Sequence, residues 1–155
     1  MAKFLLNAFS LSMVPEGAVL EIIPVTDAQA REFAVQVETL DRASQAGETP
    51  QAWLAATSAI GHADTASVLS GILGVQVPVN RTNVMLVPGH DAAIVAQYSG
   101  PRLPEGTKIL PDGAEITWFA VHVHPLAALT RANARIQKLE AKLLDILGEE
   151  GVEGL

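Results

Sequence analysis

The sequence contains no cysteine, which excludes disulfide bonds, thiolate metal ligands and a cysteine nucleophile. Basic residues are also scarce, because 10 Lys and Arg stand against 17 Asp and Glu and give a formal net charge of −7. Long nucleic acids bind basic surfaces, so this balance argues against them as partners. No apolar run approaches the roughly 20 residues of a membrane span, and the apolar N-terminal stretch breaks at Asn7, too early for a signal-peptide core. We therefore expect a cytoplasmic protein with no membrane partner.

The apolar content predicts a folded domain. Of the 155 residues, 49% are apolar and 17% are charged, which is typical of a globular chain rather than a disordered one. A chain of this length can bury a substantial core. We expect one domain over residues 1–124 and a distinct C-terminal segment over 125–155.

The first part of the chain predicts strands over 3–6 and 17–25. Thr26 and Gln29 match a capping box, and apolar residues at helical spacing extend the predicted helix to about Leu40. Residues 41–49 are polar and predict a loop. Thr49 and Pro50 suit the cap and first turn of a second helix, which should run to about residue 59.

The next part predicts a helix from about His62 to Leu73, ended by Gly74. Strands are expected over 75–79, 82–87 and 92–98, and the turn signal at 88–91 joins the last two as a β-hairpin. Residues 100–113 contain three Pro and three Gly and predict an ordered loop. A final strand is expected over 116–124.

Residues 126–147 differ in kind, because their apolar residues recur at alternating three- and four-residue steps. These residues are Leu129, Ala132, Ile136, Leu139, Leu143 and Ile146. The pattern predicts an amphipathic helix that joins copies of the chain, or one that lies on the core of its own domain. Residues 148–155 are acidic and predict a frayed tail.

The candidate site centres on Gly61 and His62, at the predicted start of the helix over 62–73. A helix N-terminus presents free backbone N–H groups and suits a phosphate. A histidine there can protonate a leaving oxygen, although a lone histidine is more often structural. Polar residues elsewhere could join it: Asn7, Ser10, Asn80, Arg81, Arg102 and Glu105.

This set of side chains suits phosphodiester cleavage by an internal 2′-hydroxyl, which needs no metal and no external water. His62 would be the general acid, Arg102 would neutralise a phosphate, and Glu105 would orient a partner. Asn7 could bind an adenine edge or a ribose, and Ser10 a phosphate or a sugar. The competing interpretation of Arg81 and Arg102 is that both are solvated surface residues.

Across residues 3–124 the sequence resembles the viral ring nuclease family, the type III anti-CRISPR enzymes of archaeal viruses and phages. The matching stretches are Asn7–Met13, Ser58–His62 with Thr65, Asn80–Arg81, Gln97 and Arg102–Gly106. The resemblance implies an α/β fold with a mixed central sheet flanked by helices, working as a homodimer. It also implies metal-independent cleavage of cyclic tetra-adenylate to linear di-adenylates that end in a 2′,3′-cyclic phosphate. No cofactor is implied, and a viral member would act in the host cytoplasm.

By that resemblance His62 and Glu105 are catalytic. The ligand-binding positions are Asn7, Ser10, Ser12, Gly61, Asn80, Arg81, Gln97 and Arg102. Ser12 stands where the family often has a second Asn. Residues 125–155 have no counterpart in the family, so the amphipathic helix over 126–147 is an addition that could strengthen the dimer or build a larger assembly.

Two other functions remain open from the sequence. One is a binding protein that sequesters a cyclic nucleotide without cutting it, since the arginines and the helix end would serve it equally. The other is a structural or regulatory protein that assembles through the C-terminal helix. His122 and His124 share one strand face at a spacing that could bind a metal, but no carboxylate cluster accompanies them, which favours a structural role.

Overall fold

The structure, a computed structural model, describes residues 1–38 and 50–153. Its centre is a five-stranded sheet with the strand order β2-β7-β6-β1-β5. The bounds are Lys3–Leu6 (β1), Val19–Val25 (β2), Thr57–Ser58 (β5), Ala92–Ser99 (β6) and Glu115–His124 (β7). β1 pairs in parallel with β5 and β6, whereas β7 pairs antiparallel with β6 and β2. The expected α/β fold with a mixed central sheet is confirmed.

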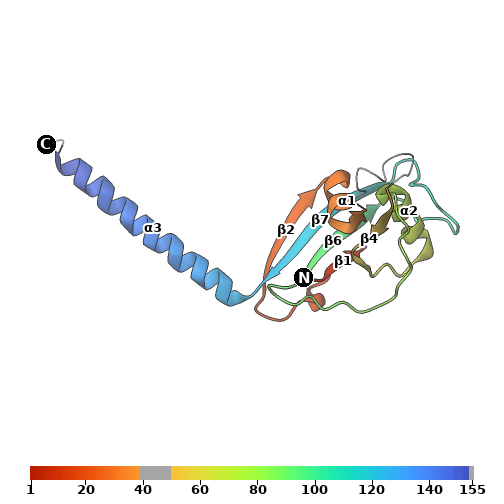
Figure 1. The fold of residues 1–155 in the computed structure, drawn as a ribbon, viewed down its shortest axis with the longest axis horizontal. Helices are drawn as coiled ribbons and strands as arrows, with labels where there is room; N and C mark the ends of the chain where they lie inside the picture. The colour runs from red at the N-terminus through yellow and green to blue at the C-terminus, as the bar shows by residue number, and fades with distance from the viewer. Residues whose placement is uncertain (39–49, 154–155) are drawn as a thin grey trace, which may run out of the picture.

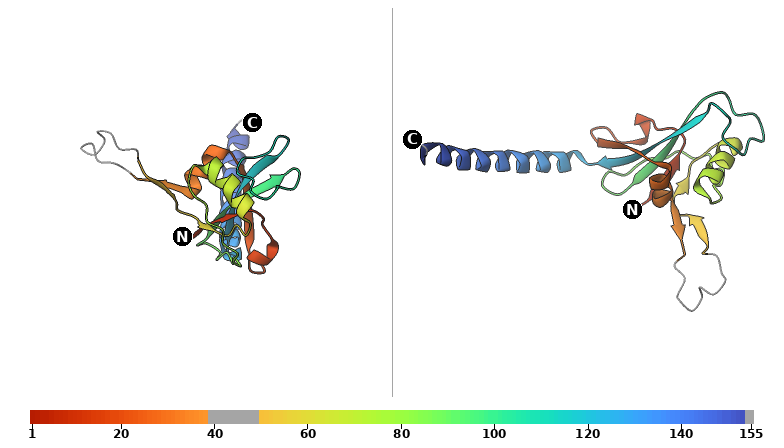
Figure 2. Two further views of the ribbon diagram at one scale, coloured as in Figure 1. Left: turned by 90° about the vertical axis from the view of Figure 1, so that its right-hand side faces the viewer. Right: turned by 90° about the horizontal axis from the view of Figure 1, so that it is seen from above.

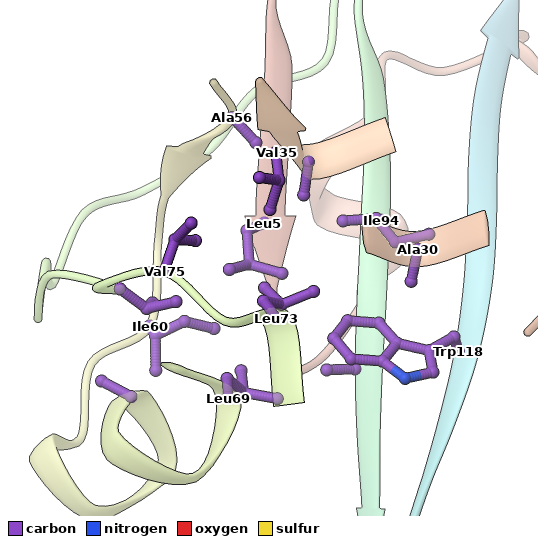
Figure 3. Close-up of a cluster of buried hydrophobic side chains, with 14 of the residues drawn as sticks. Leu5, Ala30, Val35, Ala56, Ile60, Leu69, Leu73, Val75, Ile94 and Trp118 are labelled. Carbon is purple, nitrogen blue, oxygen red and sulfur yellow. The ribbon is translucent and has the colours of Figure 1, made fainter. Parts of the chain in front are cut away.

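Two helices cover one face of this sheet. α1 (Asp27–Ala34) and α2 (Ala63–Leu73) share a buried apolar cluster with the strands, and Figure 3 shows a close-up of it. Trp118 on β7 is 1% exposed in this cluster, and its indole N–H donates to Asp27 at 2.7 Å. That hydrogen bond ties the start of α1 to the middle of the sheet and satisfies the buried indole.

Irregular segments cover the opposite face of the sheet. Leu5 and Leu6 are neighbours on β1, and they point into different clusters because side chains alternate along a strand. The second cluster is closed by Val84 and Leu86 and by residues around a short 3₁₀ turn, η1 (Leu11–Met13). A backbone hydrogen bond of 2.7 Å from the N–H of Leu86 to the carbonyl of Met13 joins the two covering segments.

The predicted helix over 26–40 begins as expected but is shorter. The capping box between Thr26 and Gln29 is present, with Thr26 N–H donating to the Gln29 side chain at 2.9 Å. The helix ends at Ala34, and Val35–Val37 continues as a strand, β3. This strand pairs antiparallel with β4 (Ala52–Leu54), and Figure 2 shows the pair projecting from the domain. Pairing with β4 outweighs the helical spacing of the apolar residues in this segment, because β-branched Val35 and Val37 favour extended backbone.

Further predictions between residues 41 and 91 are corrected. The helix over 50–59 is wrong, because β4 and β5 occupy those residues. The strands over 75–79 and 82–87 do not form, although Val75, Val77, Val84 and Leu86 are buried at alternating positions. The predicted hairpin is therefore wrong as well, since β6 pairs with β1 and β7. The loop predicted over 41–49 lies outside the described residues.

Other local predictions are confirmed. The helix predicted over 62–73 is α2, with His62 as its N-cap residue and Gly74 as its C-cap in the left-handed conformation at φ 71°. Residues 100–113 form the irregular connection between β6 and β7. The strand expected over 116–124 is β7, and the strand expected over 92–98 is β6.

The C-terminal helix α3 (Leu126–Glu153) extends away from the sheet (Figures 1 and 2). The alternative that it lies on its own domain's core is therefore wrong. The frayed tail predicted over 148–155 is wrong for the residues up to Glu153, which continue the helix. Over the part of the chain that the structure describes, no helix has the length and apolarity needed to cross a membrane.

Candidate functional site

The candidate site lies where the parallel strands of the sheet end. Asn7 follows β1 directly, Ala59–His62 connect β5 to α2, and Gln97 and Tyr98 lie near the end of β6. β1 lies between β5 and β6 and runs parallel to both, so these segments meet at one edge of the sheet. The carboxyl ends of strands are where ligand sites form in open α/β sheets.

His62 is placed by the start of α2. It is the N-cap residue, with extended backbone at φ −122° and ψ 132°, and its side chain makes no capping hydrogen bond. The side chain is exposed rather than buried in the core. Its ring nitrogens are therefore available to a ligand, and the N–H groups of the first helical turn lie beside it.

A second segment, the connection over 100–113, lies beside the start of α2. The backbone N–H of Gly106 donates to the Asp64 carboxylate at 2.9 Å, across 42 residues of sequence. The Tyr98 hydroxyl donates to the carbonyl of Pro101, and the Thr107 hydroxyl to that of Pro104. These bonds hold residues 101–107 in a fixed path beside the N-terminus of α2.

The two segments enclose an open hollow of about 750 Å³. It is lined by His62, Asp64, Thr65, Tyr98, Arg102, Leu103, Pro104 and Glu105. The structure therefore brings the predicted general acid, His62, to one hollow with Arg102 and Glu105. This volume is in the range of small-molecule sites.

Two smaller hollows lie near the first. One of about 390 Å³ is lined by Asn7, Ala59, Gly61, His62, Arg81, Thr82 and Asn83. The other, of about 340 Å³, is lined by Asn7, Ala8, Phe9, Ile22, Val95, Gln97, Phe119 and Val121. His62 lines the first two hollows and Asn7 the last two, so the three are neighbours and are together called the band. The third extends from Asn7 over the face of the sheet at Val95 and Val121.

Gly61 and Arg81 both line the middle hollow and contact each other. The Arg81 guanidinium donates through Nε to the carbonyl of Gly61 at 3.0 Å. A Cβ on Gly61 would lie 3.0 Å from Cγ of Arg81, so a glycine lets the arginine side chain pack closely there. The bond through Nε leaves the two terminal nitrogens of Arg81 to meet an anion.

Three other predicted residues lie outside this band. Ser10 and Ser12 are exposed around η1, where the Ser10 hydroxyl accepts from the Ser12 N–H at 3.3 Å. Asn80 donates through Nδ2 to the carbonyl of Ser58 at 2.8 Å, and its own N–H donates to the carbonyl of Ile60 at 2.8 Å. Asn80 therefore braces the segment that leads to His62 rather than facing the hollows.

Comparison with known proteins shows the family to which the chain belongs. The sequence model of the STIV B116-like family matches residues 3–116. The chain belongs to the STIV B116-like family. An uncharacterized protein, ORF117 of Acidianus two-tailed virus, is 36% identical over 85 residues, which is 55% of this chain and 68% of that protein. The solved structure of B116 of Sulfolobus turreted icosahedral virus matches with a TM-score of 0.57 and 25% identity, covering 79% of this chain and 99% of B116.

The B116-like match contains every candidate residue, since all of them lie between Asn7 and Glu105. α3 lies wholly outside the residues matched to the B116-like family. Both named relatives are viral proteins, so the family has viral members. Within residues 1–38 and 50–153, no group of three or more His, Asp or Glu side chains is placed to hold a metal ion. His124 instead contacts Glu21 at 2.9 Å on the neighbouring strand.

Sequence reasoning missed Asp64 and Tyr98, which line the first hollow. Asp64 was visible as an acidic residue in the first turn of α2, a position usually explained by the helix dipole alone. Tyr98 is the one tyrosine of the chain and is the last residue but one of β6, shortly before a Gly-Pro pair. Both residues bond to the connection over 100–113, and such partners across the fold leave no local pattern in the sequence.

Proposed function

We propose that this protein is a metal-independent ring nuclease that cleaves cyclic tetra-adenylate to linear di-adenylates ending in 2′,3′-cyclic phosphate. Such an activity would switch off type III CRISPR signalling, as an anti-CRISPR where the gene is viral. One observation carries the proposal: His62, Arg102 and Glu105 come from two segments distant in sequence and line one hollow at a helix N-terminus. The sequence resemblance to viral ring nucleases supports the same three residues.

The chemistry follows from what these side chains can do. In ring opening, a ribose 2′-hydroxyl loses its proton to water as its oxygen attacks the adjacent phosphorus, the P–O5′ bond breaks, and the leaving 5′-oxygen takes a proton. His62 would supply that proton, which is the contribution a positioned histidine makes in general acid catalysis. Arg102 and the N–H groups at the start of α2 would stabilise the charge that builds on the non-bridging oxygens.

The remaining residues suit binding and orientation. Two carboxylates line the same hollow as His62, those of Asp64 and Glu105. The Asp64 carboxylate already accepts a hydrogen bond from the Gly106 N–H, so Glu105 is the one left for a ligand or for His62. Glu105 would hold the imidazole or a ribose hydroxyl in place. Arg81 would meet a neighbouring phosphate from the middle hollow, while Asn7 and Gln97 would contact a base at the far end of the band.

The open, exposed position of the site favours a dimer as the active form. His62, Arg102 and Glu105 are all exposed, and charge stabilisation is weak where water has free access. A second copy placed over the band would enclose the ligand. A two-fold axis also matches a ring of four identical nucleotides, since one axis can serve both molecules.

The direct test is turnover of cyclic tetra-adenylate in excess over the protein, in the presence of EDTA, followed by chromatography and mass spectrometry. We expect complete conversion to di-adenylate carrying a cyclic phosphate, undiminished by EDTA. Recovery of intact ring after many equivalents would refute the enzyme. An intact ring together with a raised melting temperature would instead favour the sequestering protein, for which the same band would serve.

The matched variants are His62→Ala and His90→Ala. Removing a general acid should lower the single-turnover rate about 10²- to 10⁴-fold with binding of the ring retained. His90 is also exposed and lies in the turn before β6, at the opposite end of that strand from the site. His90→Ala should therefore keep the wild-type rate. Equal rates for the two variants would remove His62 from the mechanism.

A further inference from the structure

α3 carries an apolar face that the described part of the chain leaves uncovered. Five of its apolar residues at heptad spacing have exposed fractions between 41% and 58%: Leu129, Ile136, Leu139, Leu143 and Ile146. Ala132, the remaining position of the pattern, is also exposed. Contiguous exposed apolar surface of this kind marks an interaction site.

The length and period of α3 define the surface. Its 28 residues make a helix of about 42 Å at 1.5 Å per residue. The steps of three and four place Leu129, Ile136 and Leu143 at positions a of successive heptads, and Ala132, Leu139 and Ile146 at positions d. Such a seam packs knobs into holes against another helix with the same seam.

We infer that this face binds α3 of a second copy of the chain, as a parallel coiled coil. The charged residues at the g and e positions, on either side of the seam, favour a second copy of α3 in the parallel direction. The g flank carries Arg135 and Lys142, whereas the e flank carries Glu140 and Leu147. A parallel pair puts the g flank of each helix against the e flank of its partner, so Arg135 meets the partner's Glu140 twice in each dimer.

The antiparallel arrangement is disfavoured by the same residues. An antiparallel pair places g positions beside g positions and e positions beside e positions. When its apolar layers are fully aligned, Arg135 lies next to Lys142 of the other helix. Like charges there oppose association. The parallel pair additionally lets the methylenes of Lys142 pack on Leu147 while the ammonium stays in water.

The chain contains no cysteine, so a single introduced cysteine can form a disulfide only through its own position. Disulfide cross-linking between copies therefore tests which positions of α3 meet. Ala132→Cys puts the thiol on the seam at d, and Ala134→Cys puts it on the outer face at f. In the full-length protein under mild oxidation, the seam variant should form the disulfide-linked dimer at least about tenfold faster, because pairing raises the effective thiol concentration. Equal rates would overturn the proposal, even where the two domains dimerise by another surface.

Direction and partner are tested separately. An antiparallel pair separates the two d thiols by about 16 Å, so cross-linking of Ala132→Cys only to a chain carrying Leu143→Cys would overturn the parallel arrangement. Arg135→Glu and Glu140→Arg should each weaken self-association about tenfold, and a mixture of the two should restore it as a heterodimer. Sedimentation of the seam variant with phosphatidylserine vesicles, without cross-linking, would make the face a membrane surface instead and overturn the inference.

Discussion

Asp64 fixes the connection over 100–113 against α2, so replacing it should impair cleavage without unfolding the protein. Its carboxylate accepts the Gly106 N–H at 2.9 Å in an exposed setting. A hydrogen bond to a charged group contributes about 1.5–3 kcal/mol, and exposure to water reduces this to about 1 kcal/mol. Since Asp64 makes no proposed contact with the reacting atoms, the expected effect of Asp64→Ala comes from the position of Arg102 and Glu105.

A loss of about 1 kcal/mol lowers the ratio of the ordered to the disordered connection about fivefold. We therefore expect kcat/KM for cyclic tetra-adenylate to fall by up to about fivefold in Asp64→Ala, and by less in Asp64→Asn, which keeps an oxygen acceptor. The assay is the initial rate of ring opening, measured beside the denaturant midpoint of each variant.

Asp91 offers a matched control for this prediction. Its carboxylate accepts the Val87 N–H at 2.8 Å, again in an exposed position, but in the turn before β6, away from the band of hollows. Asp91→Ala should lower stability by a similar amount and leave kcat/KM unchanged. A wild-type kcat/KM in Asp64→Ala, or an equal loss in both variants, would refute the positioning role of Asp64.

Three further predictions concern the fold. Leu73→Ala empties a site that is 0% exposed and should lower the free energy of unfolding by about 2–5 kcal/mol, seen as a lower urea midpoint. Trp118→Phe leaves Asp27 without its indole donor and should cost about 1–3 kcal/mol in the same titration; an unchanged midpoint would show that the bond is not formed. Gly100→Ala would bring a Cβ within 2.9 Å of Ala114 at φ 145°, so we expect a lower melting temperature by calorimetry.

Local sequence signals located several elements correctly. The capping box at Thr26 and the stop at Gly74 depend on residues within one turn of each other, so their physics is complete in a short window. The same holds for β1 and β7, whose apolar and β-branched residues leave few alternatives. The prediction of a helix over 50–59 was wrong although its cap and proline were good local signals, because β4 pairs with a strand distant in sequence, β3.

The sequence by itself determined the inventory of the site: a histidine at a helix start, two isolated arginines, a glutamate in a Pro/Gly-containing connection, and a heptad seam. Only the tertiary structure decided which of these meet. The bond from Gly106 to Asp64 spans 42 residues, and the parallel pairing of β1 with β5 and β6 joins three distant segments. Contacts of this kind depend on packing across the sheet. The tertiary structure also bonded Asn80 to the segment that leads to His62 and left α3 extended from the domain (Figure 1).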